Sequence, residues 1–334
     1  HINPSTLIFN DTIWQMKPAD LTVADKRVEV HNFEISHAPQ YILIDGVASD
    51  QENDLLNIQL NDVDLDYIFG TLNIKHVSFG GNATGNLVAS HLFTPAPRLS
   101  TEQFDVRNFA YNGAVFGDLH LFSMWDNDNQ GILMKGFVEN PEEKQTYIDG
   151  YIFPTRDSLA LSFDPDRLNI AFLQPFVETV MTDVSGVASG HIDFYGNFKA
   201  LNVTGDAYVE NFNFGIGYLN TRYTLTDSIH FSPTRIWFDN VTVYDKLRHT
   251  AKGSGWLSHH NFKDLAYDIA ITDARDFLSY DMTERQSPTY YGTIYGTGSA
   301  LIKGEPGYNR IDVNMATGDQ SNFTFVLSGS DAAG

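Results

Sequence analysis

The 334-residue chain contains no cysteine, and this absence removes several kinds of chemistry at once. Disulfide bonds, thiolate metal sites and cysteine nucleophiles are all excluded. The absence does not fix a cellular compartment, because cysteine-free proteins occur both in the cytosol and in the periplasm.

Basic residues are scarce. The chain has 21 Lys and Arg residues against 42 Asp and Glu residues, which gives a formal net charge of −21 at pH 7. A surface for nucleic acid phosphates would have to form against this field, so nucleic acid is not an expected partner. The chain also lacks the Lys and Arg clusters that hold peripheral proteins on anionic lipid headgroups. Contact with acyl chains inside an apolar groove needs no such cluster.

Long apolar runs are missing too. No stretch approaches the roughly 18 to 20 apolar residues of a membrane-spanning helix. The first four residues, His1 to Pro4, do not begin a charged-then-apolar signal region, and residues 329–334 have the character of an arbitrary cut. We therefore expect the chain to be an internal fragment of a longer protein.

Apolar and aromatic residues are abundant, at 42% and 13% of the chain, so a disordered protein is excluded. Most segments alternate apolar and polar residues with period two between Gly, Asn and Asp turns, as residues 56–60, 159–163 and 265–271 illustrate. This pattern is typical of strands with one buried face. The sequence thus predicts an all-β fold of antiparallel strands.

The alternating segments belong to a repeat of about 105 residues. Four kinds of landmark recur in constant order: an alternating strand, a paired apolar step, a bracket of two glycines and a strand with a central Asn. The paired step is Tyr67-Ile68, Phe172-Leu173 and Phe277-Leu278, the bracket is 81–85, 186–190 and 292–296, and the Asn strands are 28–35, 106–111, 209–214 and 236–243. We predict one continuous elongated β structure, made of the tail of a preceding repeat (1–40), repeat units at 41–147 and 148–252, and a truncated unit at 253–334.

A long sheet with one apolar face cannot leave that face in water, so it must pack on a second sheet or curl into a trough. One stretch breaks the period of two: Pro175 lies among apolar residues at helical spacing. With the equivalent stretches Tyr67 to Leu72 and Phe277 to Met282, it predicts one short helix or turn in each repeat. Such a segment would be a cap over the sheet or a gate on a groove.

Catalytic, metal and cofactor sites are not expected. The chain has no Gly-x-Ser-x-Gly elbow, phosphate-binding loop or dinucleotide fingerprint. Residues 126–131 imitate the first half of a calcium loop, but Phe137 stands where the loop needs Glu, which favours a solvated hairpin turn. Asp62, Asp64 and Asp66 alternate along a strand, where an outward polar face is the simpler interpretation. The histidines follow no metal-ligand spacing.

The order of several loose motifs resembles the TamB/AsmA-like translocation and assembly module family, in particular TamB proteins of Bacteroides-type bacteria. The similar stretches are 67–85, 117–127, 205–214, 218–225, 236–243, 253–268 and 290–298. The resemblance implies a large protein anchored in the inner membrane of a Gram-negative bacterium, which crosses the periplasm as a curled sheet with an apolar interior. It further implies phospholipid transport in outer-membrane biogenesis and an outer-membrane insertase partner of the BamA/TamA kind, met by the full-length protein.

Taken together, these features predict a trough or taco-like groove that carries phospholipid acyl chains, without catalysis. Acyl chains need only a continuous apolar stripe. The candidate groove residues are Leu56, Ile58, Leu60, Leu159, Leu161, Phe163, Val203, Val209, Leu225, Phe238, Val243, Leu265, Tyr267 and Ile269. They equally suit a closed core.

Two other functions stay open at this point. A scaffold for the assembly of outer-membrane β-barrel proteins would pair its sheet edge with unfolded strands. A carbohydrate-binding β module is suggested by the aromatic residues, notably Trp14, Trp125, Trp237 and Trp256.

Overall fold

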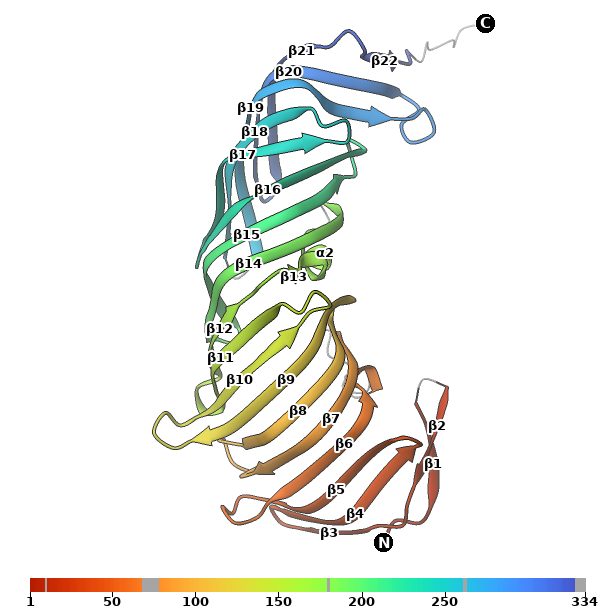
Figure 1. Ribbon diagram of the computed structural model, residues 1–334, viewed down its shortest axis with the longest axis vertical. Helices are drawn as coiled ribbons and strands as arrows, with labels where there is room; N and C mark the ends of the chain where they lie inside the picture. The colour runs from red at the N-terminus through yellow and green to blue at the C-terminus, as the bar shows by residue number, and fades with distance from the viewer. Residues whose placement is uncertain (10, 68–77, 179–180, 261–262, 328–334) are drawn as a thin grey trace, which may run out of the picture. The chain divides into compact units, whose positions relative to one another are not determined.

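The computed structural model of the chain (Figure 1) describes residues 1–9, 11–67, 78–178, 181–260 and 263–327. Within these ranges the strands belong to one antiparallel sheet of 22 strands, accompanied by a few short helices. The predicted all-β, antiparallel fold class is confirmed. The chain divides into two compact units, residues 1–168 with 191–203 and residues 169–190 with 204–334.

The first unit is an antiparallel meander in which each strand from β4 onward pairs with the next. Strands β2 and β3 both pair with β4. Its strands are β1 (Ser5–Phe9), β2 (Thr12–Met16), β3 (Asp20–Ala24), β4 (Arg27–His37), β5 (Gln40–Ser49), β6 (Leu56–Asp64), β7 (Phe79–Ser90), β8 (Arg98–Tyr111), β9 (Ala114–Asp126), β10 (Gly131–Glu139), β11 (Gln145–Phe153) and β12 (Ser158–Asp164).

Three strands contain or adjoin residues of both units: β13 (Leu168–Asn169), β14 (Thr182–Asn197) and β15 (Ala200–Ile216). The second unit continues the meander, and its last two strands both pair with β20. Its strands are β16 (Thr221–Ser232), β17 (Arg235–Asp245), β18 (Thr250–His260), β19 (Lys263–Met282), β20 (Tyr290–Glu305), β21 (Tyr308–Thr317) and β22 (Asn322–Phe325).

Among the register shifts of the described strands, six β-bulges share one form, three in each unit: each has an Asn or Asp with positive φ between 45° and 54°. These residue types tolerate the left-handed conformation better than most. The bulge takes the residue's N–H out of the ladder, and a side-chain oxygen of the neighbouring strand accepts it at 2.8 to 3.0 Å. The pairs are Asn32 with Asp45, Asp62 with Thr84, Asn108 with Asp118, Asn211 with Thr226, Asn240 with Ser254 and Asp276 with Thr297. Bulges bend a strand and increase its twist, so these six bend the sheet locally within each unit.

Contacts between strands that are not neighbours show that the sheet curls within each unit. In the first, the Trp14 ring on β2 meets the Tyr67 ring beyond β6 edge-on, with 5.7 Å between ring centroids. In the second, Tyr223 on β16 stacks on Phe277 on β19 at 5.1 Å. Each curl gives the unit an inner, apolar face and an outer, mostly polar face.

The predicted helix near Pro175 is confirmed as a 3₁₀ helix η2 (Ile170–Leu173) followed by α2 (Gln174–Val177). The prediction for Phe277 to Met282 is wrong. This stretch is the end of β19, because it pairs in register with the long strand β20, Phe277 opposite Gly296. Of the stretch Tyr67 to Leu72, residue 67 is helical together with residues 65 and 66, and the remainder lies outside the described residues.

The glycine bracket has a common structural role. Its first member, Gly81, Gly186 or Gly292, has φ of 111°, 130° or 133°. A Cβ atom at any of the three would collide with a backbone oxygen of the adjacent strand. Only glycine suits a position with this conformation and this close approach. The division into repeat units stays a prediction.

Candidate functional site

A continuous row of apolar residues crosses the inner face of the first unit. Residues that pair in an antiparallel sheet project to the same face, so the row can be followed from strand to strand. From β2 to β14 it consists of Met16, Ile35, Ile42, Leu60, Gly85, Phe104, Leu121, Gly136, Ile148, Phe163 and Ile192. At roughly 4.8 Å between strands, these residues extend about 50 Å along the sheet.

The neighbouring rows on the same face are also apolar. The row on one side consists of Val63, Ala83, Val106, Leu119 and Val138. Two rows lie on the other side. The nearer consists of Met134, Gly150, Leu161 and Phe194, and the farther of Ile132, Ile152, Leu159 and Gly196. The polar residues that continue these rows, Thr101, Ser123 and Thr146, carry no charge. The face is therefore suited to hydrocarbon along its whole described length.

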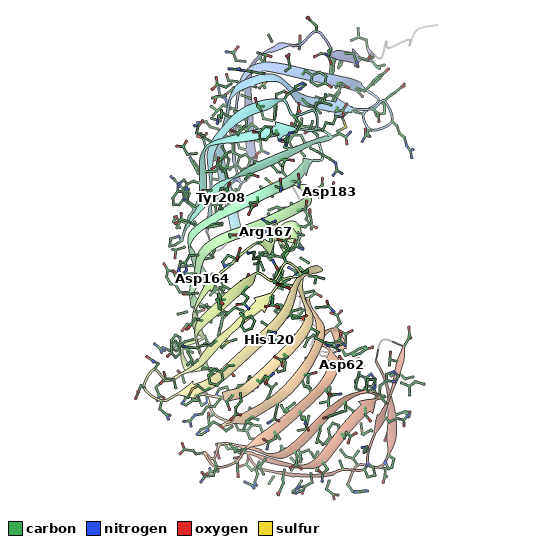
Figure 2. The ribbon with its side chains drawn as sticks, in the orientation of Figure 1. Asp62, His120, Asp164, Arg167, Asp183 and Tyr208 are labelled. Atoms are coloured by element: carbon green, nitrogen blue, oxygen red, sulfur yellow. The ribbon has the colours of Figure 1, made fainter. Side chains whose placement is uncertain are left out.

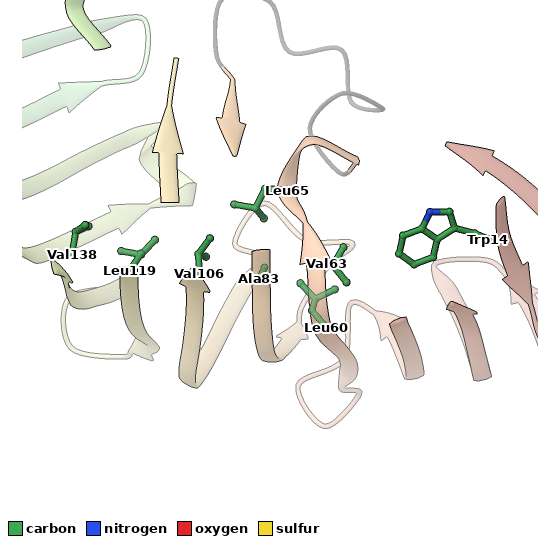
Figure 3. Packing of buried hydrophobic residues seen from close by; sticks show 8 residues of the cluster. All are labelled: Trp14, Leu60, Val63, Leu65, Ala83, Val106, Leu119 and Val138. Carbon is green, nitrogen blue, oxygen red and sulfur yellow. The ribbon is translucent and has the colours of Figure 1, made fainter. Parts of the chain in front are cut away.

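One part of this face is sealed and another is open. Val63, Val106 and Val138 are buried in a cluster that has Trp14 at one end (Figure 3). In the long row, Leu60 belongs to this cluster, whereas Phe104, Leu121 and Ile148 pack against it and stay partly exposed, as does Phe163. Phe163 and Phe194 meet edge-on at 5.4 Å, and both stay partly exposed.

The second unit presents equivalent rows. They are Phe212, Leu225, Val243 and Ala251, then Phe238, Gly255, Ile269, Ile302 and Ile311, and Gly205, Phe231, Ile236, Leu257, Tyr267 and Gly304. Ile271, Ala300 and Val313 border a hollow of 330 Å³. The paired residues on this face include two carboxylates, Asp227 opposite Val209 and Asp245 opposite Tyr223.

All 14 candidate residues lie on these inner faces. Leu60, Val203, Val209, Leu225 and Val243 are buried. Partly exposed are Leu56, Ile58, Leu159, Leu161, Phe163, Phe238, Tyr267 and Ile269, whereas Leu265 is 38% exposed. The register brings together candidates far apart in sequence, such as Leu60 and Phe163 in one row.

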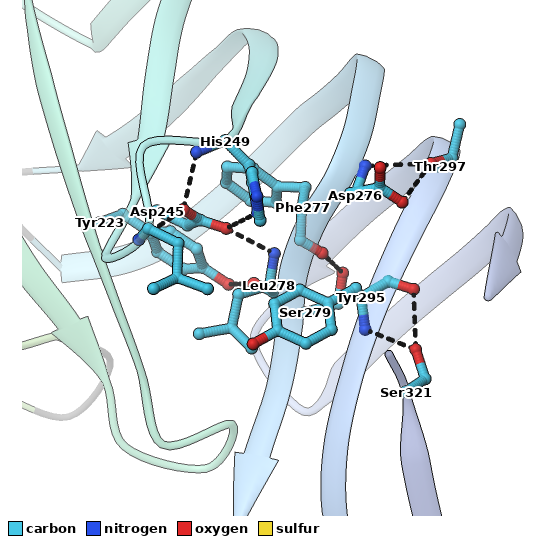
Figure 4. A network of polar contacts seen from close by, with 11 residues as sticks. Tyr223, Asp245, His249, Asp276, Phe277, Leu278, Ser279, Tyr295, Thr297 and Ser321 are labelled. Carbon is cyan, nitrogen blue, oxygen red and sulfur yellow. Dashed lines mark hydrogen bonds and ion pairs between the residues drawn. The ribbon is translucent and has the colours of Figure 1, made fainter. Parts of the chain in front are cut away.

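In the second unit, hydrogen bonds with Tyr223 and Asp245 hold Leu278 of β19 against β16 and β17 (Figure 4). We call this network the polar lock. The buried Asp245 carboxylate accepts the N–H groups of Leu247 at 2.8 Å, of His249 at 2.9 Å and of Leu278 at 2.9 Å. The Tyr223 hydroxyl donates to the carbonyl of the same Leu278 at 2.9 Å. Both backbone groups of Leu278 are thus held by side chains from β16 and β17, and its own side chain is fully buried.

Burial determines the chemistry of this lock. It raises the pKa of Tyr223 to about 12, and the nearby Asp245 charge acts in the same direction. The phenol therefore stays protonated, and remains a donor, throughout the physiological range.

The contacts of Asp245 were not predicted from the sequence, nor was the position of Phe277 and Leu278 over the inner face. The paired apolar step was recognised as a landmark, but an extended segment that turns over the face was not anticipated. A usable signal was the polar turn at residues 245–249, whose first and last members, Asp245 and His249, also form an ion pair at 3.1 Å.

The outer face holds the acidic residues considered for cation binding. The Asp126 carboxylate accepts the N–H groups of Asp128 and Asn129 in the β9–β10 hairpin turn, and hydrogen bonds from Asn129 lower the pKa of Asp126. Asp62 is a bulge residue paired with Arg107, so it does not line up with Asp64 and Asp66 as strict alternation predicts. Across the part of the chain that the structure describes, no three His, Asp or Glu side chains are arranged to hold a metal ion.

Comparisons of the chain with protein-family models, with curated proteins and with solved structures give no match. Among the described residues, no helix has the length and apolar character needed to cross a membrane. Function therefore has to be argued from the geometry of the two faces.

Proposed function

We propose that the inner apolar faces bind the acyl chains of phospholipids, as one segment of a conduit between the inner and outer membranes. The observation that carries the proposal is the row from Met16 to Ile192: eleven residues from successive paired strands, without a charged member. A binding site for hydrocarbon needs continuity and apolarity rather than directional contacts.

Partial exposure supports a groove over a sealed core. Each methylene group removed from water contributes about 0.8 kcal/mol, so a chain with about ten buried methylenes would gain roughly 8 kcal/mol before the cost of its ordering. Leu161 and Phe163 on the open part of the face have remaining apolar surface to offer to such a chain.

The cellular setting of the proposal comes from the resemblance to TamB-like proteins. It is the periplasm of a Gram-negative bacterium, with a full-length protein anchored in the inner membrane and an outer-membrane insertase of the BamA/TamA kind as its partner. The proposal that acyl chains bind rests on the inner face alone, so it is tested separately from the cellular setting.

The direct test is native mass spectrometry, with lipid extraction, of the chain expressed in a bacterial host and purified without detergent. Stoichiometric phospholipid is the expected result. A clean apo mass together with a cooperative melt would count against a groove and favour the scaffold for β-barrel assembly.

A matched pair of variants on β12 sharpens the test. Leu161→Arg introduces a charge into the open apolar rows, whereas Ala160→Arg introduces it on the outer face, where Ala160 is exposed. By analogy with arginine on a lipid-facing strand, the inner charge costs bound lipid about 2 kcal/mol, or a roughly 30-fold loss of affinity.

Leu161→Arg should lower lipid occupancy while the chain stays folded, and Ile269→Arg should do the same in the second unit. Ala160→Arg should leave occupancy unchanged. Unfolding by both inner variants would show that these residues fill a closed core.

A further inference from the structure

The outer face of the first unit carries a row of aromatic side chains flanked by carboxylates. The register aligns Asp105, His120, Phe137, Tyr147 and Asp164 on five neighbouring strands, β8 to β12, and we call them the first aromatic row. Asp105 holds the His120 ring at 2.7 Å. The ring centroid of Phe137 lies 4.8 Å from that of His120 and 6.2 Å from that of Tyr147. Figure 2 labels two members of the row, His120 and Asp164.

The second unit has a row of the same composition. Asp206, His230, Trp237, Trp256 and Asp268 are aligned on β15 to β19, and we call them the second aromatic row. Asp206 again pairs with the histidine, whose ring stacks on Trp237 at 5.2 Å. A basic side chain contacts the last carboxylate in both rows: Lys303 contacts Asp268 at 2.8 Å, and His191 contacts Asp164 at 2.5 Å in the first unit.

The two rows thus share one order of side chains: carboxylate, histidine, two aromatic rings, and a carboxylate with a basic partner. Because both occur on the outer face, they do not contribute to the apolar rows of the inner face. One ring of each row is well exposed, Tyr147 at 51% and Trp237 at 37%. The other ring of each row, Phe137 or Trp256, is partly buried, and the Arg235 guanidinium lies 4.7 Å from the centroid of the Trp256 ring. A row that served only to stabilise the sheet would not need this recurring polar arrangement around exposed rings.

A pocket lies on the first row. It has a volume of 400 Å³ and is bordered by Asp105, His120, Phe137, Gln103 and Lys135. This hollow is shallow and open to solvent, and its lining combines aromatic rings with hydrogen-bond donors and acceptors.

We propose that each aromatic row binds a saccharide chain, with pyranose rings stacked on the aromatic side chains and sugar hydroxyls bonded to the flanking carboxylates. A pyranose ring with equatorial substituents presents only C–H groups on its faces, which suits an aromatic surface, and presents hydroxyl donors at its rim, which suit carboxylates. Successive rings in a row come from strands roughly 4.8 Å apart, a spacing comparable to one sugar residue of a β-1,4-linked chain.

The four tryptophans differ in whether they belong to an aromatic row. Trp237 and Trp256 pair with each other in the second row. Trp14 is buried and cannot bind a ligand from solvent, so its candidacy for carbohydrate binding was wrong. Trp125 pairs with Ile132 of the inner rows and belongs to neither aromatic row.

The test is isothermal titration calorimetry of the whole chain with cellohexaose and with chitohexaose, followed in parallel by tryptophan fluorescence. One of the two hexaoses should bind with two sites per chain and change the fluorescence of the second row. Tyr147→Ala and Trp237→Ala should each weaken one site about tenfold. Tyr195→Ala and Tyr208→Ala are matched controls, because both tyrosines are exposed outside the aromatic rows.

Failure of both hexaoses to bind at millimolar concentration would overturn the proposal. An equal loss of affinity in the row variants and in the control variants would overturn it as well. If Trp237→Ala lowers the melting temperature, Asp206→Asn tests the same row through a carboxylate whose side chain is 74% exposed. Lipid occupancy in the inner groove should be unaffected by all of these variants, so the outcome is independent of the acyl-chain proposal.

Discussion

Replacement of Asp245 by alanine should destabilise the second unit strongly. Its side chain is wholly buried, and its carboxylate accepts three backbone N–H groups. A buried N–H left without an acceptor costs about 1 to 3 kcal/mol. The N–H groups of Leu247 and His249 belong to an exposed turn and regain water at little cost, whereas the N–H of Leu278 is buried. Together with the lost His249 contact, the expected destabilisation is about 3 kcal/mol.

Urea unfolding of the whole chain, followed by circular dichroism and by tryptophan fluorescence, measures this loss. Asp239→Ala is the matched control on the same strand, because the Asp239 carboxylate is exposed and accepts a hydrogen bond from the Ser254 hydroxyl at 3.0 Å. Its replacement should cost about 0.5 kcal/mol or less. Equal midpoints for the two variants would refute the view that Asp245 holds the covering segment.

Tyr223→Phe extends the test to the second contact with Leu278. It removes one hydrogen bond while keeping the ring that stacks on Phe277, so the expected loss is about 1 kcal/mol. Since both side chains hold the backbone of one residue, the double variant should lose less than the sum of the single variants. Strict additivity would mean that the two contacts act independently.

Two further predictions concern single residues on β14 and β15. A hydrogen bond to Asp164 raises the pKa of His191, so its stabilising contribution is complete below the unfolded pKa of about 6.5 and is lost as pH rises through the folded value. His191→Gln should therefore lower the melting temperature at about pH 5.5 but hardly at about pH 8, and an equal drop at both would contradict it. At Asn211, where φ is 50°, Asn211→Val should cost about 1 to 2 kcal/mol in urea unfolding whereas Asn211→Gly should be nearly neutral. Equal losses from both would indicate that the side-chain amide, rather than the backbone conformation, matters.

The sequence alone was sufficient for the strands and for the face that each candidate occupies. Alternation in residues 56–60 and 159–163 depends only on the period of two, which holds wherever one side of a strand is apolar. That is why Leu60 and Phe163, chosen without any knowledge of register, lie in the same row.

Features that depend on contacts between distant strands could not be predicted in this way. Phe277 to Met282 has a short apolar pattern that suits a helix or a strand equally, and the long partner β20 decides between them. Trp14 becomes buried because the sheet curls toward Tyr67, and the lock at Asp245 forms because β19 reaches β16 and β17. Of these contacts, only those of Asp245 have a local signal, the polar turn at residues 245–249.

The bulges, by contrast, do have a sequence signature that can now be recognised. Each has the order apolar, polar, Asn or Asp, apolar: residues 30–33, 60–63, 106–109, 209–212, 238–241 and 274–277. The first and last residues both face inward, since the extra Asn or Asp absorbs the added position. A strand without this residue would keep the same inward side chains but lose its bend. The six bulges therefore bend the sheet without interrupting the apolar rows, and this combination is what a curved groove for acyl chains requires.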